Sequence, residues 1–168
     1  MIVTFYGVRG STAMPGPMTA KYGGNTSCVH IELESGHDLI LDAGTGIRQL
    51  GNKLAHKSTA AHILLSHGHW DHIQGYPFFA PIYQPEREIH VYISVGKGRK
   101  LLSSLFQQMD GTHFPVRVED LPSNNFPKFK GIESELYERE GIKVIKQALN
   151  HPGGGSAYKI DENGARLA

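Results

Sequence analysis

Cysteine is almost absent from this sequence, because Cys28 is the only one among 168 residues. A single cysteine cannot form an internal disulfide, so a disulfide-stabilised scaffold and a four-cysteine zinc module are both excluded. Any bound metal must therefore be held by histidine and carboxylate side chains. Cys28 itself lies in a run that alternates apolar and polar residues, which predicts a small buried side chain rather than a nucleophile.

An excess of charge of one sign and long apolar runs are also lacking. The 17 Lys and Arg residues nearly balance the 16 Asp and Glu residues, so the net charge is +1 with neutral histidines and directs the chain to neither nucleic acid nor membranes. No apolar run approaches the roughly 18–20 residues of a membrane-spanning helix. The first residues lack the cationic segment and the longer apolar core of a signal peptide. We expect a cytoplasmic protein with one domain and no membrane association.

Short apolar runs separated by turn residues predict the secondary structure. Strands are predicted over 2–7, 28–33, 39–41, 62–65, 89–94, 142–149 and 157–160. Helices are predicted from Thr45 through Leu54, over 73–83 with interruptions at Pro77 and Pro81, and over 97–109. Residues 110–130 are predicted to be irregular.

Four potential metal ligands follow the strand at 62–65 within six residues: His67, His69, Asp71 and His72. Side chains at alternate positions of a loop can point to the same side, so His67 and His69 can hold one cation while the other two face a neighbouring one. Imidazole mixed with carboxylate suits zinc, manganese or iron, and zinc is the default expectation. Two adjacent metals activate water for hydrolysis. The alternative is a surface tract of histidines that binds metal without catalysis.

Three motifs resemble those of the metallo-β-lactamase-fold hydrolases: residues 66–72 (SHGHWDH), 41–46 (LDAGTG) and 150–153 (NHPG). Residues 7–11 (GVRGS) and 22–28 (YGGNTSC) are similar to the phosphodiesterase branch, which includes ribonuclease Z-like and cyclic-nucleotide phosphodiesterase-like proteins. The resemblance implies a mixed α/β (α+β) fold, the αββα sandwich, over residues 1–168.

The resemblance also implies roles for particular side chains. A first metal would be held by His67, His69 and His151, and a second by Asp71 and His72. Asp71 would also orient the attacking water, which makes it the expected catalytic residue. Asp42 would support the site from behind the ligands.

This sequence departs from the family pattern at its end. Family members continue with a bridging aspartate and a final histidine, and neither has a counterpart here, because Asp161 lies in a predicted turn. We therefore expect a C-terminally truncated domain, with the N-terminal half to two-thirds of the sandwich and one tightly bound metal in place of two.

The expected function is a metal-dependent hydrolase that cleaves a phosphodiester by attack of metal-bound hydroxide. A thioester or lactone hydrolase on the same fold and a non-catalytic metal-binding fragment or subunit remain alternatives. The net charge gives no support to a nucleic-acid partner, and a homo-oligomer stays open.

Aromatic residues gather directly after the ligand cluster, at Trp70, Tyr76, Phe78, Phe79 and Tyr83. Packing of a helix against the sheet is the simpler interpretation, and stacking on a nucleobase is the alternative. His113 is in a loop that can reach over the site, although an ordinary loop histidine is the simpler interpretation.

Overall fold

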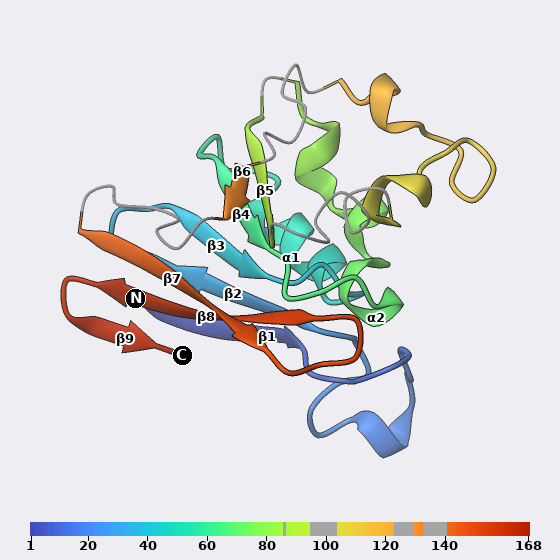
Figure 1. Cartoon of the computed structure of the whole chain (residues 1–168). Helices are drawn as coiled ribbons and strands as arrows, with labels where there is room; N and C mark the ends of the chain where they lie inside the picture. Colours follow the sequence, from blue (N-terminus) through green and yellow to red (C-terminus); the bar gives the residue numbers. More distant parts are fainter. Residues whose placement is uncertain (86, 95–103, 123–129, 133–140) are drawn as a thin grey trace.

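A six-stranded sheet forms the centre of the molecule (Figure 1). The structure, a computed structural model, describes residues 1–85, 87–94, 104–122, 130–132 and 141–168. The strands lie in sequence order: β1 (Ile2–Gly7), β2 (Cys28–Glu32), β3 (Asp38–Leu41), β4 (Ala61–Leu64), β5 (Ile89–Ser94) and β6 (Lys130–Ile132). The first three strands pair antiparallel, and β3 to β6 pair parallel.

A second, three-stranded antiparallel sheet crosses one face of the first (Figure 1). It consists of β7 (Ile142–Leu149), β8 (Gly155–Glu162) and β9 (Ala165–Leu167). Ile142, Val144 and Ile160 of this sheet pack with Ile31 and Leu64 of the first in a buried apolar cluster. Burial of these aliphatic side chains holds the two sheets together.

Short helices cover the other face of the central sheet. They are α1 (Ile47–Leu54), α2 (Trp70–Ile73) and the single 3₁₀ turns η2 (Tyr76–Phe78) and η3 (Ala80–Tyr83), whereas the 3₁₀ turns η1 (Pro17–Thr19) and η4 (Val118–Asp120) bury no residue. Ile47, Leu50 and Leu54 of α1 fall at helical spacing and are all buried against the sheet. None of the helices in the described part of the chain is long and apolar enough to cross a bilayer.

The central strands are buried on both faces, as β4 illustrates. Ile63 packs into the cluster under the helices, whereas its neighbour Leu64 packs against the second sheet. This arrangement explains why the two apolar residues follow each other directly in β4 with no polar residue between them, which is typical of parallel strands covered on both sides. The layers of helix, sheet and sheet confirm the mixed α/β class expected from the sequence.

Several elements differ from the expectations. The helix expected over 73–83 is broken into α2, η2 and η3, because the proline rings prevent a continuous ladder of backbone hydrogen bonds. Of the helix expected over 97–109, residues 104–107 are helical and 97–103 lie outside the described residues. β8 is longer than expected and includes Asp161, which was expected in a turn but pairs with Lys143 and Arg166. The turn itself lies at Asn163 and Gly164 and leads into β9, a strand that was not expected.

Candidate metal centre

The candidate centre lies at one edge of the central sheet, where the parallel strands β3 and β4 end side by side. Leu41 pairs with Leu64 at these ends, and the chains leave the sheet at Asp42 and Leu65. The loop after β4 carries His67 and His69, and His69 keeps an extended backbone until α2 begins at the next residue. The ends of parallel strands meet at one edge, so residues distant in sequence come together there.

His151 reaches the same place from the turn between β7 and β8. Two hydrogen bonds fix this hairpin to the loop after β4: the Ser156 N–H donates to the Ser66 carbonyl (2.9 Å), and the Tyr158 hydroxyl donates to the Leu65 carbonyl (2.7 Å). Gly153 and Gly154 both have φ near +85°, a conformation that glycine adopts without strain. The turn after His151 therefore depends on these glycines.

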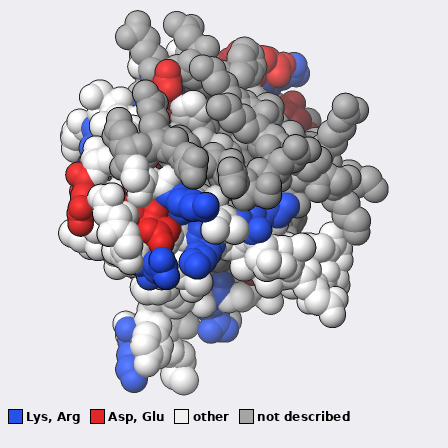
Figure 2. Space-filling view, turned by 60° about the vertical axis from the view of Figure 1, so that its left-hand side comes forward, with Lys and Arg blue, Asp and Glu red and all other residues white. Residues whose placement is uncertain are grey.

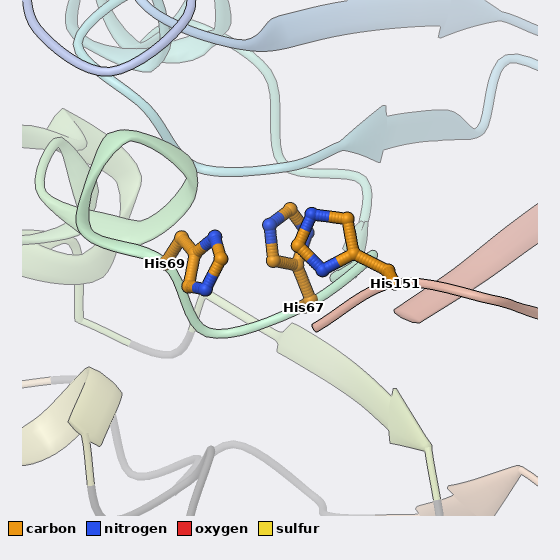
Figure 3. Close-up of side chains that lie close together, drawn as sticks. All are labelled: His67, His69 and His151. Carbon is orange, nitrogen blue, oxygen red and sulfur yellow. The ribbon is translucent and has the colours of Figure 1, made fainter. Parts of the chain in front are cut away.

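The three imidazole rings converge, with His67 and His69 coming from the loop after β4 and His151 from the hairpin (Figure 3). Ring centroids lie 4.5 Å apart for His67 and His69, 4.4 Å for His67 and His151, and 4.9 Å for His69 and His151. One ligand nitrogen of each ring lies within 4.8 Å of the others. Zinc binds imidazole nitrogens at about 2.0–2.1 Å in tetrahedral sites, so this spacing fits one ion among the three rings.

Hydrogen bonds at the rear of two rings select the tautomer that a metal needs. The Nδ1 atom of His151 lies 2.9 Å from the Pro152 carbonyl, which only accepts, so Nδ1 carries the proton and Nε2 is left with its lone pair. The Nδ1 atom of His67 lies 3.0 Å from the Ser66 hydroxyl. That hydroxyl donates its proton to Asp42 at 2.9 Å and therefore accepts from His67.

Asp42 is the buried carboxylate on which these contacts depend. One oxygen accepts from the Ser66 N–H (2.8 Å), and the other accepts from Nδ1 of His72 (2.7 Å) and from the Ser27 hydroxyl (3.2 Å). Asp42 has φ +62°, a left-handed conformation that aspartate and asparagine tolerate better than most residues. A single side chain thus orients His72 directly and His67 through Ser66.

Asp71 and His72 stand together beside the three rings. The Asp71 Oδ2 atom lies 3.5 Å from Nε2 of His72, and the rings of His67 and His72 are 4.1 Å apart. The same Asp71 oxygen accepts a hydrogen bond from the Ser11 N–H at 2.7 Å. The structure therefore brings together all five residues that the sequence analysis selected as ligands.

Burial and neighbouring charges shift the pKa values of this group in different directions. Burial lowers the pKa of His67 to about 4, with further lowering by the neighbouring His72 and His69, so this ring is uncharged at neutral pH. Burial alone would raise the pKa of Asp71, but the Ser11 N–H and the nearby His72 outweigh it and hold the pKa below its ordinary value. For His72, burial lowers the pKa, but the hydrogen bond to Asp42 and the negative charges of Asp42 and Asp71 outweigh it, so the pKa is raised.

The glycine-rich motif at 42–46 packs against the segment at 23–28. The Thr45 N–H donates to the Thr26 hydroxyl (2.8 Å), and the Thr26 N–H donates to the Thr45 hydroxyl (2.9 Å). A side chain at Gly44 would collide with the Asp71 carbonyl and with Thr26. Only glycine allows this close approach of the loop beneath Asp71. Sequence reasoning missed the reciprocal threonine pair, although both residues lie in motifs that it had singled out.

Other residues considered in the sequence lie in different surroundings. His113 is exposed and is held by Asp110 through its Nδ1 atom at 3.0 Å, so it stays an ordinary loop histidine. His62 stacks on His90 on the central sheet, 4.8 Å between centroids. Cys28 is fully buried, as expected, and burial raises the pKa of its thiol.

Comparison with known proteins gives one family and several solved structures. The model of the β-lactamase superfamily domain matches residues 37–160. No curated protein matches the chain in sequence. Solved structures with the same fold include a diphosphatase of the PhnP family, at 17% identity and a TM-score of 0.65. They also include the short form of human tRNase Z, at 19% identity and a TM-score of 0.64. Zinc-bound PqqB from Methylobacterium extorquens matches at 16% identity and a TM-score of 0.62.

These structures are longer than the present chain. The similarity covers 94% of this chain and 60% of the diphosphatase, 98% and 66% for the tRNase, and 98% and 63% for PqqB. The chain thus spans about three-fifths of the length of its structural neighbours. The shared fold places the strand ends and loops of the candidate centre within an established architecture, and of the three structures named above PqqB is zinc-bound.

Proposed function

This chain belongs to the β-lactamase superfamily, and from that premise we propose that it is a metal-dependent hydrolase that cleaves a phosphodiester. We assign His67, His69 and His151 as ligands of one Zn²⁺ ion, with Asp71 and His72 beside it. The observation that carries the proposal is the convergence of three imidazoles from two separate segments of the chain. Histidines scattered over a surface do not meet in this way, so a non-catalytic surface tract is less well supported.

A bound divalent ion at this centre supplies a Lewis acid that makes water nucleophilic at neutral pH and offsets negative charge on a phosphoryl oxygen. The protein side chains perform the remaining work. The Asp71 carboxylate, whose pKa is held below its ordinary value and which is therefore fully ionised at neutral pH, accepts a hydrogen bond from the attacking water and orients it. The Ser11 N–H holds Asp71 at 2.7 Å, and Asp42 directs Nε2 of His72 toward the same space.

A phosphodiester is favoured over a carbonyl ester by two kinds of support. The sequence segments 7–11 and 22–28 resemble the phosphodiesterase branch, and the second of them packs beneath the centre through Thr26. Two structural neighbours are a diphosphatase and a tRNase by name. We therefore place phosphodiesters first and thioesters or lactones second.

The test is hydrolysis by the chain reconstituted with Zn²⁺, Mn²⁺ or Fe²⁺. Bis-(p-nitrophenyl) phosphate and cyclic nucleotides are compared with glutathione thioesters and acyl lactones. We expect phosphodiester cleavage that His69→Ala abolishes, whereas His113→Ala, which alters an exposed histidine outside the centre, leaves it unchanged. Cleavage of carbonyl substrates alone would contradict the phosphodiester assignment, and metal uptake without any turnover would favour the non-catalytic alternative.

A further inference from the structure

A strained backbone turn lies against the candidate centre. Ser11 has φ +69°, and the Thr12 N–H donates to the Gly10 carbonyl at 2.9 Å. A hydrogen bond from residue i+2 to residue i around a central residue of positive φ is the classic γ-turn, which is rare and strained. The other non-glycine residues of positive φ in the described part of the chain, Asp42 and Asn163, are of types that tolerate it better than serine. The conformation of Ser11 therefore costs free energy that another contact must offset.

That contact is made with the expected catalytic residue. The Ser11 N–H donates to Oδ2 of Asp71 at 2.7 Å, across 60 positions of the chain. Hydrogen bonds to an ionised carboxylate are shorter and stronger than those between neutral groups. The same Asp71 oxygen lies 3.5 Å from Nε2 of His72. The bond therefore brings the strained turn into direct contact with the centre and restricts the direction of the Asp71 carboxylate.

The chain that leads into the turn is fixed to the body of the protein. The Val8 and Arg9 N–H groups both donate to the Asn25 carbonyl, at 3.1 and 3.0 Å. The Thr45 hydroxyl donates to the Asn25 side chain at 3.2 Å, which joins this segment to the glycine-rich loop beneath the centre. Catalytic groups are held accurately when the residues that support them are themselves locked in place. Ser11 thus reaches the centre from an anchored segment.

Long-range charge contributes little to the orientation of Asp71. The net charge is +1. Among the described residues on the face shown in Figure 2, Lys and Arg lie between acidic and uncharged side chains. Charges of mixed sign produce little net field at a distance. Short contacts such as the one from Ser11 therefore decide how this carboxylate is oriented.

We propose that Ser11 is a positioning residue, whose γ-turn aims a backbone N–H at Asp71 and so holds the catalytic carboxylate toward the attacking water. This inference rests on the proposed function, because it concerns the carboxylate that we assign to that water. The Ser11 hydroxyl is not needed for this role. Residue 11 must supply a backbone N–H and a positive φ, which glycine and asparagine adopt readily and β-branched residues do not.

Substitutions at residue 11 separate the role of the backbone from that of the side chain. Hydrolysis of bis-(p-nitrophenyl) phosphate is measured with the zinc-loaded chain. We expect Ser11→Val to lower kcat by roughly 10–100-fold with little change in KM, because a misdirected catalytic group slows the reaction without weakening substrate binding. Ser11→Gly and Ser11→Asn keep the turn and retain the wild-type kcat. A loss in Ser11→Gly as large as that in Ser11→Val would overturn the proposal, because it would assign the role to the hydroxyl.

Two control variants test whether strain or proximity alone accounts for the effect. Thr12→Val alters the next side chain without removing a backbone N–H, and we expect it to leave kcat unchanged. Asn163→Val places a β-branched residue at φ +51° in the turn between β8 and β9. It lowers the urea midpoint of unfolding without lowering kcat. Equal losses of kcat in Ser11→Val and Asn163→Val would show that destabilisation, and not positioning, is responsible.

Hydrogen exchange at the amide of residue 11 tests the contact without any turnover. Ser11 is exposed, so its amide exchanges slowly only if the hydrogen bond to Asp71 protects it. We expect slow exchange in the wild-type chain and in Ser11→Gly. Ser11→Val and Asp71→Ala accelerate it by roughly tenfold or more, because each breaks a hydrogen bond to a charged group. Fast exchange in the wild-type chain would overturn the proposal.

Should Ser11→Val fail to fold, an ester in place of the amide between Gly10 and Ser11 removes the N–H and keeps the side chain. Cys28 is the only cysteine, so a synthetic peptide of residues 1–27 that carries the ester can be ligated to residues 28–168. We expect the same loss of kcat. Slow exchange without turnover in the wild-type chain would refute the proposed hydrolase but support the positioning contact. Turnover that neither the valine nor the ester reduces would refute positioning but support the hydrolase.

Discussion

Replacing Asp42 with asparagine removes the charge that orients two of the assigned ligands. The carboxylate accepts from Nδ1 of His72 at 2.7 Å and from the Ser66 hydroxyl at 2.9 Å. Asparagine has the same shape and tolerates the left-handed backbone at this position, so the substitution changes hydrogen bonding without adding backbone strain. The effect therefore isolates the role of the carboxylate.

The consequence follows from the donors and acceptors. The amide of Asp42→Asn donates from one side, so Nδ1 of His72 must accept and its proton moves to Nε2, the atom that is to bind metal. In this orientation the amide oxygen still accepts from the Ser66 N–H and hydroxyl, so the tautomer of His67 is kept and the change falls on His72. Loss of such supporting contacts typically lowers metal affinity 10–100-fold, or about 1.4–2.7 kcal/mol. Losing a hydrogen bond to a charged group also lowers the free energy of unfolding by about 1.5–3 kcal/mol.

Zinc affinity is measured by competition with a chromophoric chelator, and unfolding by urea titration of the metal-free chain. Asp161→Asn is the control, since Asp161 also accepts hydrogen bonds, from Gly164 and Arg166, outside the centre. Long-range ¹H–¹⁵N spectra report which imidazole nitrogen carries the proton. Wild-type zinc affinity in Asp42→Asn, together with an unchanged His72 tautomer, would refute the reasoning.

Three further predictions concern stability. Gly44→Ala forces a Cβ into the surrounding backbone and lowers the free energy of unfolding by about 2–3 kcal/mol, whereas Gly10→Ala, in open space, changes it little; equal urea midpoints would contradict this. Burial, reinforced by two neighbouring histidines, lowers the pKa of His62 from 6.5 to about 4. The unfolded chain therefore binds more protons between these pH values, so the free energy of unfolding falls by about 3 kcal/mol as the pH drops from 6.5 to 4, and His62→Phe flattens this slope. Tyr158→Phe loses the hydrogen bond to the loop after β4, which lowers the free energy of unfolding by about 1 kcal/mol and weakens zinc binding through the loosened hairpin; exposed Tyr22→Phe changes neither.

The sequence predicted most strands and the residues that gather at the centre. Alternation and turn residues located β2, β3 and β7, because short local patterns determine which residues become strands. The spacing of His67, His69, Asp71 and His72 gave the ligand cluster, since neighbours in one loop are close in any fold. His151 came from the resemblance to a family, because its approach to the other rings depends on how the β7–β8 hairpin docks.

The features that sequence reasoning missed depend on tertiary contacts. The pairing of Thr26 with Thr45 joins two loops, and no local pattern shows which hydroxyl meets which backbone N–H. The exposure of Trp70 beside the burial of Tyr76 depends on where the broken helix runs over the sheet. Proline positions predicted interruptions in that helix, but not the division into separate turns.

The most direct test of the central claim is a crystal structure of the zinc-soaked chain with anomalous difference density recorded at the zinc edge. The claim predicts one strong peak at about 2.0–2.1 Å from an imidazole nitrogen of each of His67, His69 and His151. A peak that omits His151, or zinc density confined to other histidines, would contradict it.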